Sequence, residues 1–130
     1  MAKARVLVAD DNKAIREILI STLAGEFEVI RAVSDGGSAV AAVEQLLPDV
    51  AILDISMPVL NGIEVARRIR ETAKNVAVIF VTVCSDSDTF EAAADAGCLA
   101  YVLKPRLCTD LVPAVHQALK GALFVSPGLG

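Results

Sequence analysis

Five short runs of small apolar residues recur along the chain, and each is followed by a stretch whose apolar residues repeat at helical spacing. The runs lie at residues 5–9, 27–33, 50–53, 76–81 and 99–103. Continuous apolar runs of this length are typical of strands that are covered on both faces of a parallel sheet. Five alternations of strand and helix, joined by right-handed crossovers, predict a doubly wound α/β fold of the (βα)5 type. We expect the flavodoxin-like strand order 2-1-3-4-5.

Cap and turn residues indicate where the helices between these runs begin and end. Asn12 can cap the first helix at its amino terminus, and Gly25 can end it. Pro48 stops the second helix, because proline cannot continue a helix interior. The chain from Gly121 onward, with Pro127 and two later glycines, looks loosely tethered. We therefore expect one domain over residues 1–121 and a tail or linker over residues 122–130.

The composition fits a buried sheet and excludes several other classes of protein. Hydrophobic residues make up 55% of the 130 residues and aromatic residues only 4%, a balance that excludes a disordered chain. The three cysteines are too few for a disulfide scaffold. The longest apolar run, residues 76–84, falls well short of the roughly 18 residues of a membrane span, so we expect a soluble, cytoplasmic domain. The net charge of −4 argues against a domain that grips nucleic acid by itself.

Polar residues stand where four of the five predicted strands end. Asp10 and Asp11 follow the first strand, Asp54 the third, Thr82 the fourth and Lys104 the fifth. In a doubly wound sheet, ligands bind outside the carboxyl ends of the strands, at the point where the strand order reverses. We therefore expect three carboxylates, a hydroxyl and an ammonium group to meet at one edge of the sheet.

This set of groups favours phosphoryl chemistry with a divalent cation. Oxygen ligands of this kind suit Mg²⁺, which takes one or two carboxylates and completes its shell with water and substrate phosphate. Lys104 offers a point charge, and Thr82 a hydrogen bond, to phosphate oxygens. Asp54, on the central strand, is the best-placed nucleophile and would become an aspartyl phosphate. Each residue alone also has an ordinary interpretation: a helix cap, a turn, a strand residue or a solvated lysine.

Several ordered motifs resemble the receiver domain of two-component response regulators, and the resemblance covers essentially the whole chain. They are the segments 6–12 (VLVADDN), 49–58 (DVAILDISMP) and 61–64 (NGIE), followed by Val81-Thr82, residues 96–101 (AGCLAY) and Lys104-Pro105. The acidic pair alone would not be specific, but the ordered set is.

The resemblance implies a role for each site residue. Asp54 resembles the phosphoacceptor, which would take its phosphoryl group from a phosphohistidine on a sensor histidine kinase or a phosphotransfer protein. Asp11 and Asp54 resemble direct Mg²⁺ ligands, Asp10 a ligand through water, and Ser56 a ligand through its main-chain carbonyl. Thr82 and Tyr101 resemble the switch pair, and Lys104 the phosphate-binding lysine, whose bond to Pro105 is cis in the family. The output would be a population shift of the face built by helix 4, strand 5 and helix 5, acting on transcription.

Val83 departs from the family pattern, in which Ala or Gly usually follows the switch threonine. Its two additional methyl groups could narrow the approach of a phosphodonor or of water. Ser56 and Cys84 occupy positions that line the path of water in the family. We therefore predict atypical turnover, which these three residues tune.

Two alternatives from other classes stay open at this stage. One is a receiver-like interaction module that works without phosphate, and the other is a Mg²⁺-dependent phosphohydrolase that uses Asp54. The leading hypothesis, against both alternatives, is a switch that catalyses its own phosphorylation and dephosphorylation and is not a metabolic enzyme. Residues 121–127 resemble the segment that closes receivers attached to helix-turn-helix output domains, so a missing downstream domain could bind DNA. Family members also pair through helices 4 and 5 or 1 and 5, which makes a homodimer an expectation.

Overall fold

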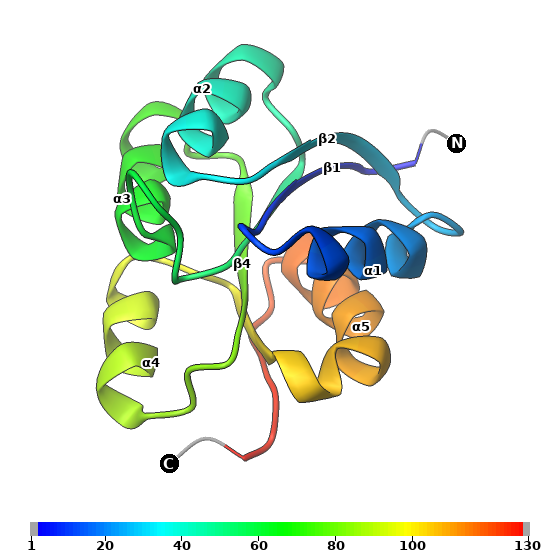
Figure 1. The fold of residues 1–130 in the computed structure, drawn as a ribbon, viewed down its shortest axis with the longest axis vertical. Coiled ribbons are helices and arrows are strands. Elements are labelled where there is room, and N and C mark those ends of the chain that lie inside the picture. Colours follow the sequence, from blue (N-terminus) through cyan, green and yellow to red (C-terminus); the bar gives the residue numbers. More distant parts are fainter. Residues whose placement is uncertain (1–2, 129–130) are drawn as a thin grey trace.

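Helices cover both faces of one parallel sheet in the computed structural model, which describes residues 3–128 (Figure 1). The strands are β1 (Arg5–Ala9), β2 (Glu28–Val33), β3 (Val50–Leu53), β4 (Ala77–Thr82), β5 (Ala100–Leu103) and β6 (Phe124–Val125). The helices are α1 (Lys13–Leu23), α2 (Gly36–Leu46), α3 (Gly62–Thr72), α4 (Ser87–Asp95) and α5 (Leu107–Leu119), with a 3-10 turn η1 (Lys104–Arg106) before α5. The strand order is β2-β1-β3-β4-β5-β6, and every neighbouring pair is parallel. The predicted fold class and the order of the first five strands are confirmed.

The central strands are buried on both faces, which explains their unbroken apolar runs. Because successive side chains of a strand point to opposite faces, each strand contributes to two separate cores. Leu7, Leu53 and Phe80 pack toward α2, α3 and α4. Val8 and Ile52 pack toward α1 and α5 on the other face. The sheet is therefore the shared wall of two hydrophobic clusters, and its carboxyl edge is held rigidly between them.

Side-chain caps fix the starts of four helices on that edge. Asn12 accepts a hydrogen bond from the Ile15 N–H, as its sequence position predicts, and α1 ends at Leu23, two residues before Gly25. Asp35 and Asp86 cap α2 and α4 in the same way. The caps of α1, α2 and α4 satisfy amide groups that have no partner within their own helices. They also set where each loop enters its helix.

Asn61 starts α3 with a reciprocal arrangement. Its side chain accepts from the Glu64 N–H while the Glu64 carboxylate accepts from the Asn61 N–H, which is a capping box. This helix follows the loop after β3, so the box fixes the far end of the loop that carries the residues just after Asp54.

The chain beyond Gly121 is more ordered than the sequence led us to expect. Phe124 and Val125 form β6, which pairs with Ala100 and Tyr101 of β5. The expectation of a loosely tethered tail is wrong for these residues, because main-chain hydrogen bonds attach them to the sheet. Two residues are too short a run for periodicity to reveal a strand. Whether the segment leads into an output domain stays a prediction.

The Lys104–Pro105 bond is trans, so the cis bond implied by the family resemblance is wrong for this structure; residues 3–128 hold no cis peptide bond. Pro105 lies in the first turn of η1. The fixed φ of proline and its missing N–H suit that position in a helical turn, where the amide would have no intrahelical partner. Lys104 therefore lies in a short helical turn that leads directly into α5.

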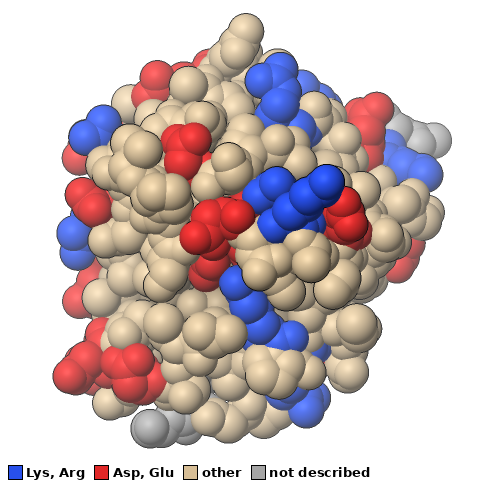
Figure 2. Space-filling model, in the orientation of Figure 1, with Lys and Arg blue, Asp and Glu red and all other residues tan. Residues whose placement is uncertain are grey.

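Acidic side chains gather over α4 on the face shown in Figure 2, at its lower left. The exposed acidic residues of α4 and its N-cap are Asp86, Asp88, Glu91 and Asp95. Within residues 3–128, no helix is both long enough and apolar enough to cross a bilayer.

Candidate functional site

The carboxyl edge of the sheet brings together the three predicted carboxylates. Oxygen atoms of Asp10, Asp11 and Asp54 all lie within 4.8 Å of one another. Asp10 and Asp54 are buried, whereas Asp11 is exposed at the mouth. We call Asp10, Asp11, Asp54 and Lys104 the acid pocket. Its opening lies where β1 and β3 are neighbours, the switch point that the strand order predicts.

Lys104 spans the two buried carboxylates. Its ammonium nitrogen lies 2.9 Å from Asp10 Oδ2 and 3.1 Å from Asp54 Oδ2, and its side chain is only 14% exposed. Burial acts to lower the pKa of Lys104, but its close contacts with the Asp10 and Asp54 carboxylates outweigh it, so the pKa is raised. The ammonium therefore stays charged at neutral pH and neutralises part of the acid pocket.

Asp54 carries a raised pKa despite its contact with Lys104. Burial is the main cause, and the neighbouring charge of Asp10 adds to it; the hydrogen bond from Lys104 works in the opposite direction. A carboxylate whose ionised form is poorly solvated is a stronger nucleophile and a stronger cation ligand than an exposed one. These properties distinguish Asp54 from the acidic residues on the helix surfaces.

Close backbone packing fixes the position of Asp54. Its N–H donates to the Ala9 carbonyl at 2.9 Å, and the Gly62 N–H donates to the Ile55 carbonyl at 2.8 Å. A Cβ atom at Gly62 would lie 2.2 Å from the main-chain oxygen of Asp54. Only glycine permits this approach, so the start of α3 lies directly against the backbone of the candidate acceptor.

Thr82 and Tyr101 are both completely buried, and both contact Cys84. The Thr82 hydroxyl accepts from the Cys84 N–H at 3.2 Å, and the Tyr101 hydroxyl donates to the Cys84 carbonyl at 2.7 Å. The predicted switch pair is therefore linked through one residue of the loop between β4 and α4. Because the Thr82 hydroxyl is used as an acceptor, its proton remains free to donate.

The three predicted access residues differ in exposure. Val83 is 68% exposed, Cys84 is half-buried and Ser56 is exposed. Val83 therefore projects into solvent next to Thr82 and does not pack into the core. Its methyl groups add exposed apolar surface next to Thr82 in the chain.

Sequence reasoning missed two groups that support the site. Arg16 donates from Nη1 to the main-chain carbonyl of Asp10 at 2.7 Å, and the Asn12 N–H donates to Asp10 Oδ1 at 2.8 Å. The second group consists of Asp110 and Ser126, which are buried beyond Lys104. Arg16 lies six residues after Asp10, across a loop and the start of α1, and no sequence pattern predicts a contact at that separation. Asp110 and Ser126 are brought together by the unpredicted β6.

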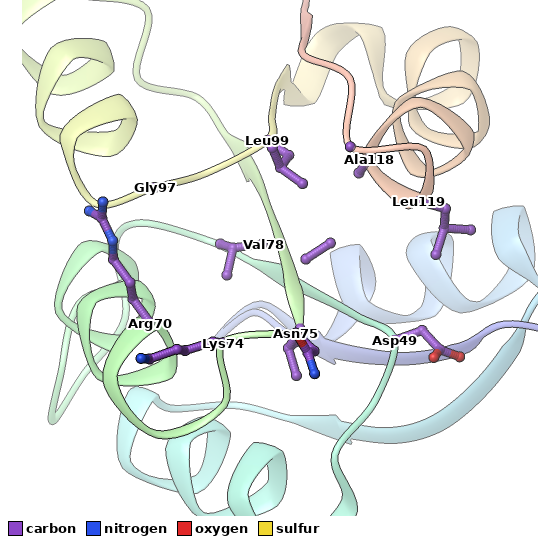
Figure 3. A pocket seen from close by; sticks show the side chains of 12 residues that line it. Asp49, Arg70, Lys74, Asn75, Val78, Gly97, Leu99, Ala118 and Leu119 are labelled. Carbon is purple, nitrogen blue, oxygen red and sulfur yellow. The ribbon is translucent and has the colours of Figure 1, made fainter.

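A cleft lies at the opposite end of the sheet, lined by residues at the amino ends of β3, β4 and β5. It encloses about 620 Å³. Figure 3 shows Arg70 and Lys74 on one side and Asp49 and Leu119 on the other. Asp49, Val76 and Leu99 directly precede β3, β4 and β5, so the cleft lies at the end of the sheet away from the acid pocket.

The acid pocket fits a divalent cation. Asp10 Oδ2 is buried and makes no hydrogen bond of standard geometry with any described residue; its close cationic neighbour is Lys104. Three carboxylates at this separation repel one another unless positive charge lies between them. Oxygen-only ligands of this type match the preference of Mg²⁺. Asp10, Asp11 and Asp54 could therefore hold such an ion.

Comparisons with known proteins agree with this fold. The sequence model of the response regulator receiver domain matches residues 6–116. The transcriptional regulatory protein PdtaR of Mycobacterium tuberculosis is 38% identical over 117 residues, which are 88% of this chain and 56% of that protein. The DNA-binding response regulator MtrA of Mycolicibacterium smegmatis is 33% identical over 91% of this chain and 51% of that protein.

Solved structures give the same result. The signal receiver domain of the response regulator NarL from Mycobacterium tuberculosis superposes with a TM-score of 0.89 at 31% identity, covering 93% of this chain and 99% of that one. A LuxR-family two-component response regulator from Aurantimonas sp. superposes with a TM-score of 0.91 at 27% identity, covering 97% and 91% of the two chains. This chain belongs to the response regulator receiver domain family of two-component systems. It spans about half the length of the curated relatives named above.

Proposed function

We propose that this chain is a phosphoacceptor switch, and that Asp54 receives a phosphoryl group from a phosphohistidine on a sensor histidine kinase or phosphotransfer protein. The observation that carries the proposal is that one oxygen from each of three carboxylates lies within 4.8 Å of the others, while a half-buried ammonium group contacts two of these carboxylates. A surface cluster of acids would not supply a buried nucleophile and a fixed cation together. Family membership supports the same reaction class.

In the proposed step, a carboxylate oxygen of Asp54 attacks phosphorus and forms an acyl phosphate. The P–N bond of the donor breaks, and its electron pair leaves with the imidazole. Mg²⁺, held by Asp11 and Asp54 directly, by Asp10 through water and by the Ser56 carbonyl, would neutralise charge on the transferred group. Asp54 is already held in position by its main-chain contacts with Ala9 and Gly62.

Lys104 and Thr82 would stabilise the added phosphoryl oxygens. The Lys104 ammonium lies 3.1 Å from Asp54 Oδ2, so a short rotation of its side chain lets it contact a group attached there. The Thr82 hydroxyl keeps its proton available as a donor. Water would later hydrolyse the acyl phosphate, so the chain catalyses its own phosphorylation and dephosphorylation and has no metabolic substrate.

The proposed output is a shift of the face built by α4, β5 and α5. Thr82 and Tyr101 both contact Cys84, so movement of Thr82 toward a phosphoryl group would change the loop that holds Tyr101. Relatives that are transcriptional regulators support transcription as the controlled process. With a net charge of −4, residues 1–130 are not proposed to bind DNA themselves; a downstream domain would do so. The proposed location is the cytoplasm.

Self-association through α1 and α5 is a second part of the proposal. Ile18 on α1 and Leu119 on α5 are each 42% exposed, and the two helices pack side by side. The exposed acidic residues of α4 would repel those of a second copy, so we propose pairing through α1 and α5 in preference to pairing through α4. An Ile18→Asp variant that elutes as a smaller species than the parent on size exclusion would support this face.

One experiment tests the phosphoacceptor proposal. The chain is incubated with Mg²⁺ and a small phosphodonor, and intact mass is measured. We expect a gain of one phosphoryl group that Asp54→Asn abolishes, and that the exposed helix variant Asp88→Asn keeps. No gain with small donors or with a range of kinases would overturn the proposal in favour of a phosphate-independent interaction module.

A further inference from the structure

Asp110 and Ser126 form a buried polar pair that the proposed phosphotransfer does not use. Asp110 lies in the first turn of α5, and Ser126 follows β6; they are 5% and 2% exposed. The Ser126 hydroxyl donates to Asp110 Oδ2 at 2.6 Å. With Arg106, these residues form what we call the clasp.

The clasp contacts the chain on both sides of Lys104, at the main chain of Leu103 and at the side chain of Arg106. Before it, the Leu103 N–H donates to Ser126 Oγ at 3.2 Å. After it, Arg106 donates to Asp110 Oδ2 from Nε at 2.8 Å and to Oδ1 from Nη2 at 3.3 Å. The segment that carries Lys104 is therefore linked to the Asp110 carboxylate at both ends, through the Ser126 hydroxyl before Lys104 and through the Arg106 side chain after it.

Strand β6 brings Ser126 to this point. The Phe124 N–H donates to the Leu99 carbonyl at 3.0 Å, and the Ser126 N–H donates to the Tyr101 carbonyl at 2.9 Å. The hydroxyl of Ser126 then reaches the next N–H group along β5 that faces it, that of Leu103. The C-terminal segment is thus bonded in turn to the residue before β5, to Tyr101 and to the residue before Lys104.

The clasp stays in its hydrogen-bonded form at neutral pH. Hydrogen bonds from Arg106, and then from Ser126, hold the pKa of Asp110 below its usual range against the opposing effect of burial. A buried carboxylate without such partners is strongly disfavoured. Losing the Ser126 hydroxyl would also leave the buried N–H of Leu103 without its acceptor.

We propose that Asp110 and Ser126 are positioning residues for Lys104, and that through them β6 is coupled to the state of Asp54. A lysine side chain has many rotamers, so a fixed main chain decides how often its ammonium spans Asp10 and Asp54 at 2.9 and 3.1 Å. Coupling between two sites is reciprocal: if the clasp orders Lys104, then a group on Asp54 that binds Lys104 must alter the clasp. This inference rests on the proposed function, because it assigns Lys104 to the phosphoryl group.

The first test compares phosphorylation rates by a small phosphodonor. Net loss of one hydrogen bond shifts an equilibrium by roughly threefold to tenfold, so we expect Ser126→Ala to be slower by about that factor. Ser126→Thr keeps the hydroxyl and should recover part of the rate, and Thr109→Ala, on an exposed neighbour of Asp110, should match the parent. A parent-like rate for Ser126→Ala would overturn the proposal.

A double-variant comparison separates positioning from general destabilisation. In a Lys104→Met background, Ser126→Ala should cause no further loss of rate, because the residue acts through Lys104. An equal further loss in that background would mean that the clasp acts on stability alone and would overturn the proposal. Thermal unfolding of each variant, followed by circular dichroism, shows whether it is folded at the assay temperature.

Hydrogen exchange tests the coupling to β6 without measuring turnover. In the parent with Mg²⁺, adding beryllofluoride should change exchange of the Leu103 and Ser126 amides by at least about twofold, and unchanged rates would overturn the coupling. If the parent accepts no phosphoryl group, the proposed function fails. The coupling is then tested by comparing amide exchange in Lys104→Met with exchange in the parent, both without a phosphoryl mimic. Altered exchange at Ser126 would then support it, and identical exchange would overturn it.

Discussion

The Tyr101 hydroxyl donates a hydrogen bond of 2.7 Å to the main-chain carbonyl of Cys84. The tyrosine is completely buried, and its ring packs edge-on against Phe80 and Phe90 with centroid separations of 6.4 and 5.2 Å. Its inward position is therefore held both by apolar packing and by one polar contact to the loop after β4. The two contributions can be separated by substitution.

Tyr101→Phe should remove the polar contribution alone. The ring contacts persist, but the Cys84 carbonyl loses its donor, so we expect a loss of roughly 0.5–1.5 kcal/mol in the free energy of unfolding. Urea unfolding followed by circular dichroism measures it. Tyr101→Leu, which also removes the edge-on ring contacts, should lose clearly more. Equal losses for the two variants would contradict this account.

The phenol of Tyr101 should not ionise while the domain is folded. Burial raises the pKa of Tyr101 above its ordinary value of 10.0, with smaller contributions from Cys84 and Asp86. This is the single tyrosine in a chain without tryptophan, so phenolate absorbance reports on it cleanly. We expect absorbance near 295 nm to stay flat through pH ~10 and to rise only as the chain unfolds. A reversible transition near pH 10 in folded protein would refute the buried, hydrogen-bonded position.

Asp54→Asn should stabilise the metal-free domain at neutral pH. The folded state raises the pKa of Asp54 through burial and the nearby charge of Asp10, so ionising this carboxyl disfavours folding. We expect the Tm to rise by a few degrees, the scale on which ~1 kcal/mol moves a domain of this size. The difference from the parent should shrink as the pH falls through the folded pKa and vanish below the ordinary value of 3.8. Melting curves from pH 3 to 8 check the direction, and a gap that widens in acid would contradict it.

Gly62→Ala should damage the site and the fold together. The added Cβ would lie 2.2 Å from the Asp54 carbonyl oxygen, so either α3 or the acceptor strand must shift. Overpacking of this kind costs about 1–3 kcal/mol. Gly25→Ala is the matched control, since a Cβ there meets nothing within 4 Å. Denaturant unfolding and the mass assay should show losses for Gly62→Ala and parent-like values for Gly25→Ala.

Val83→Ala should change turnover with little effect on stability. The side chain is 68% exposed, so its removal leaves the core intact and the unfolding free energy within about 0.5 kcal/mol of the parent. Less apolar bulk beside Thr82 should speed both phosphorylation by a small donor and loss of the phosphoryl group, by roughly twofold or more. Rates that match the parent in both directions would remove the idea that Val83 tunes access.

The apolar runs were sufficient to predict the sheet and its order, because buried parallel strands leave an unmistakable pattern. β1 and β3 match their predicted bounds, and the other three strands shift by a single residue at one or both ends. The acidic edge followed from the order, since Asp10, Asp11 and Asp54 come directly after strands that are neighbours in space.

What the sequence could not predict depends on contacts between residues distant along the chain. β6 is two residues long, which is too short for a periodic pattern to predict. It forms by pairing with the edge of β5, a contact between residues distant along the chain. The clasp joins Asp110 and Ser126 only once that strand has formed. The trans bond before Pro105 was missed for a different reason: the family resemblance, not a local pattern, suggested the cis form.

The position of β6 in the sheet also limits how far a signal must travel. Asp54 follows β3, and only β4 and β5 lie between β3 and β6. At roughly 4.8 Å per strand spacing, that is a lateral span of about 15 Å. A structural change caused by a charge added at Asp54 could thus pass to β6 directly across the sheet, through the hydrogen bonds between neighbouring strands, without the movement of a hinge.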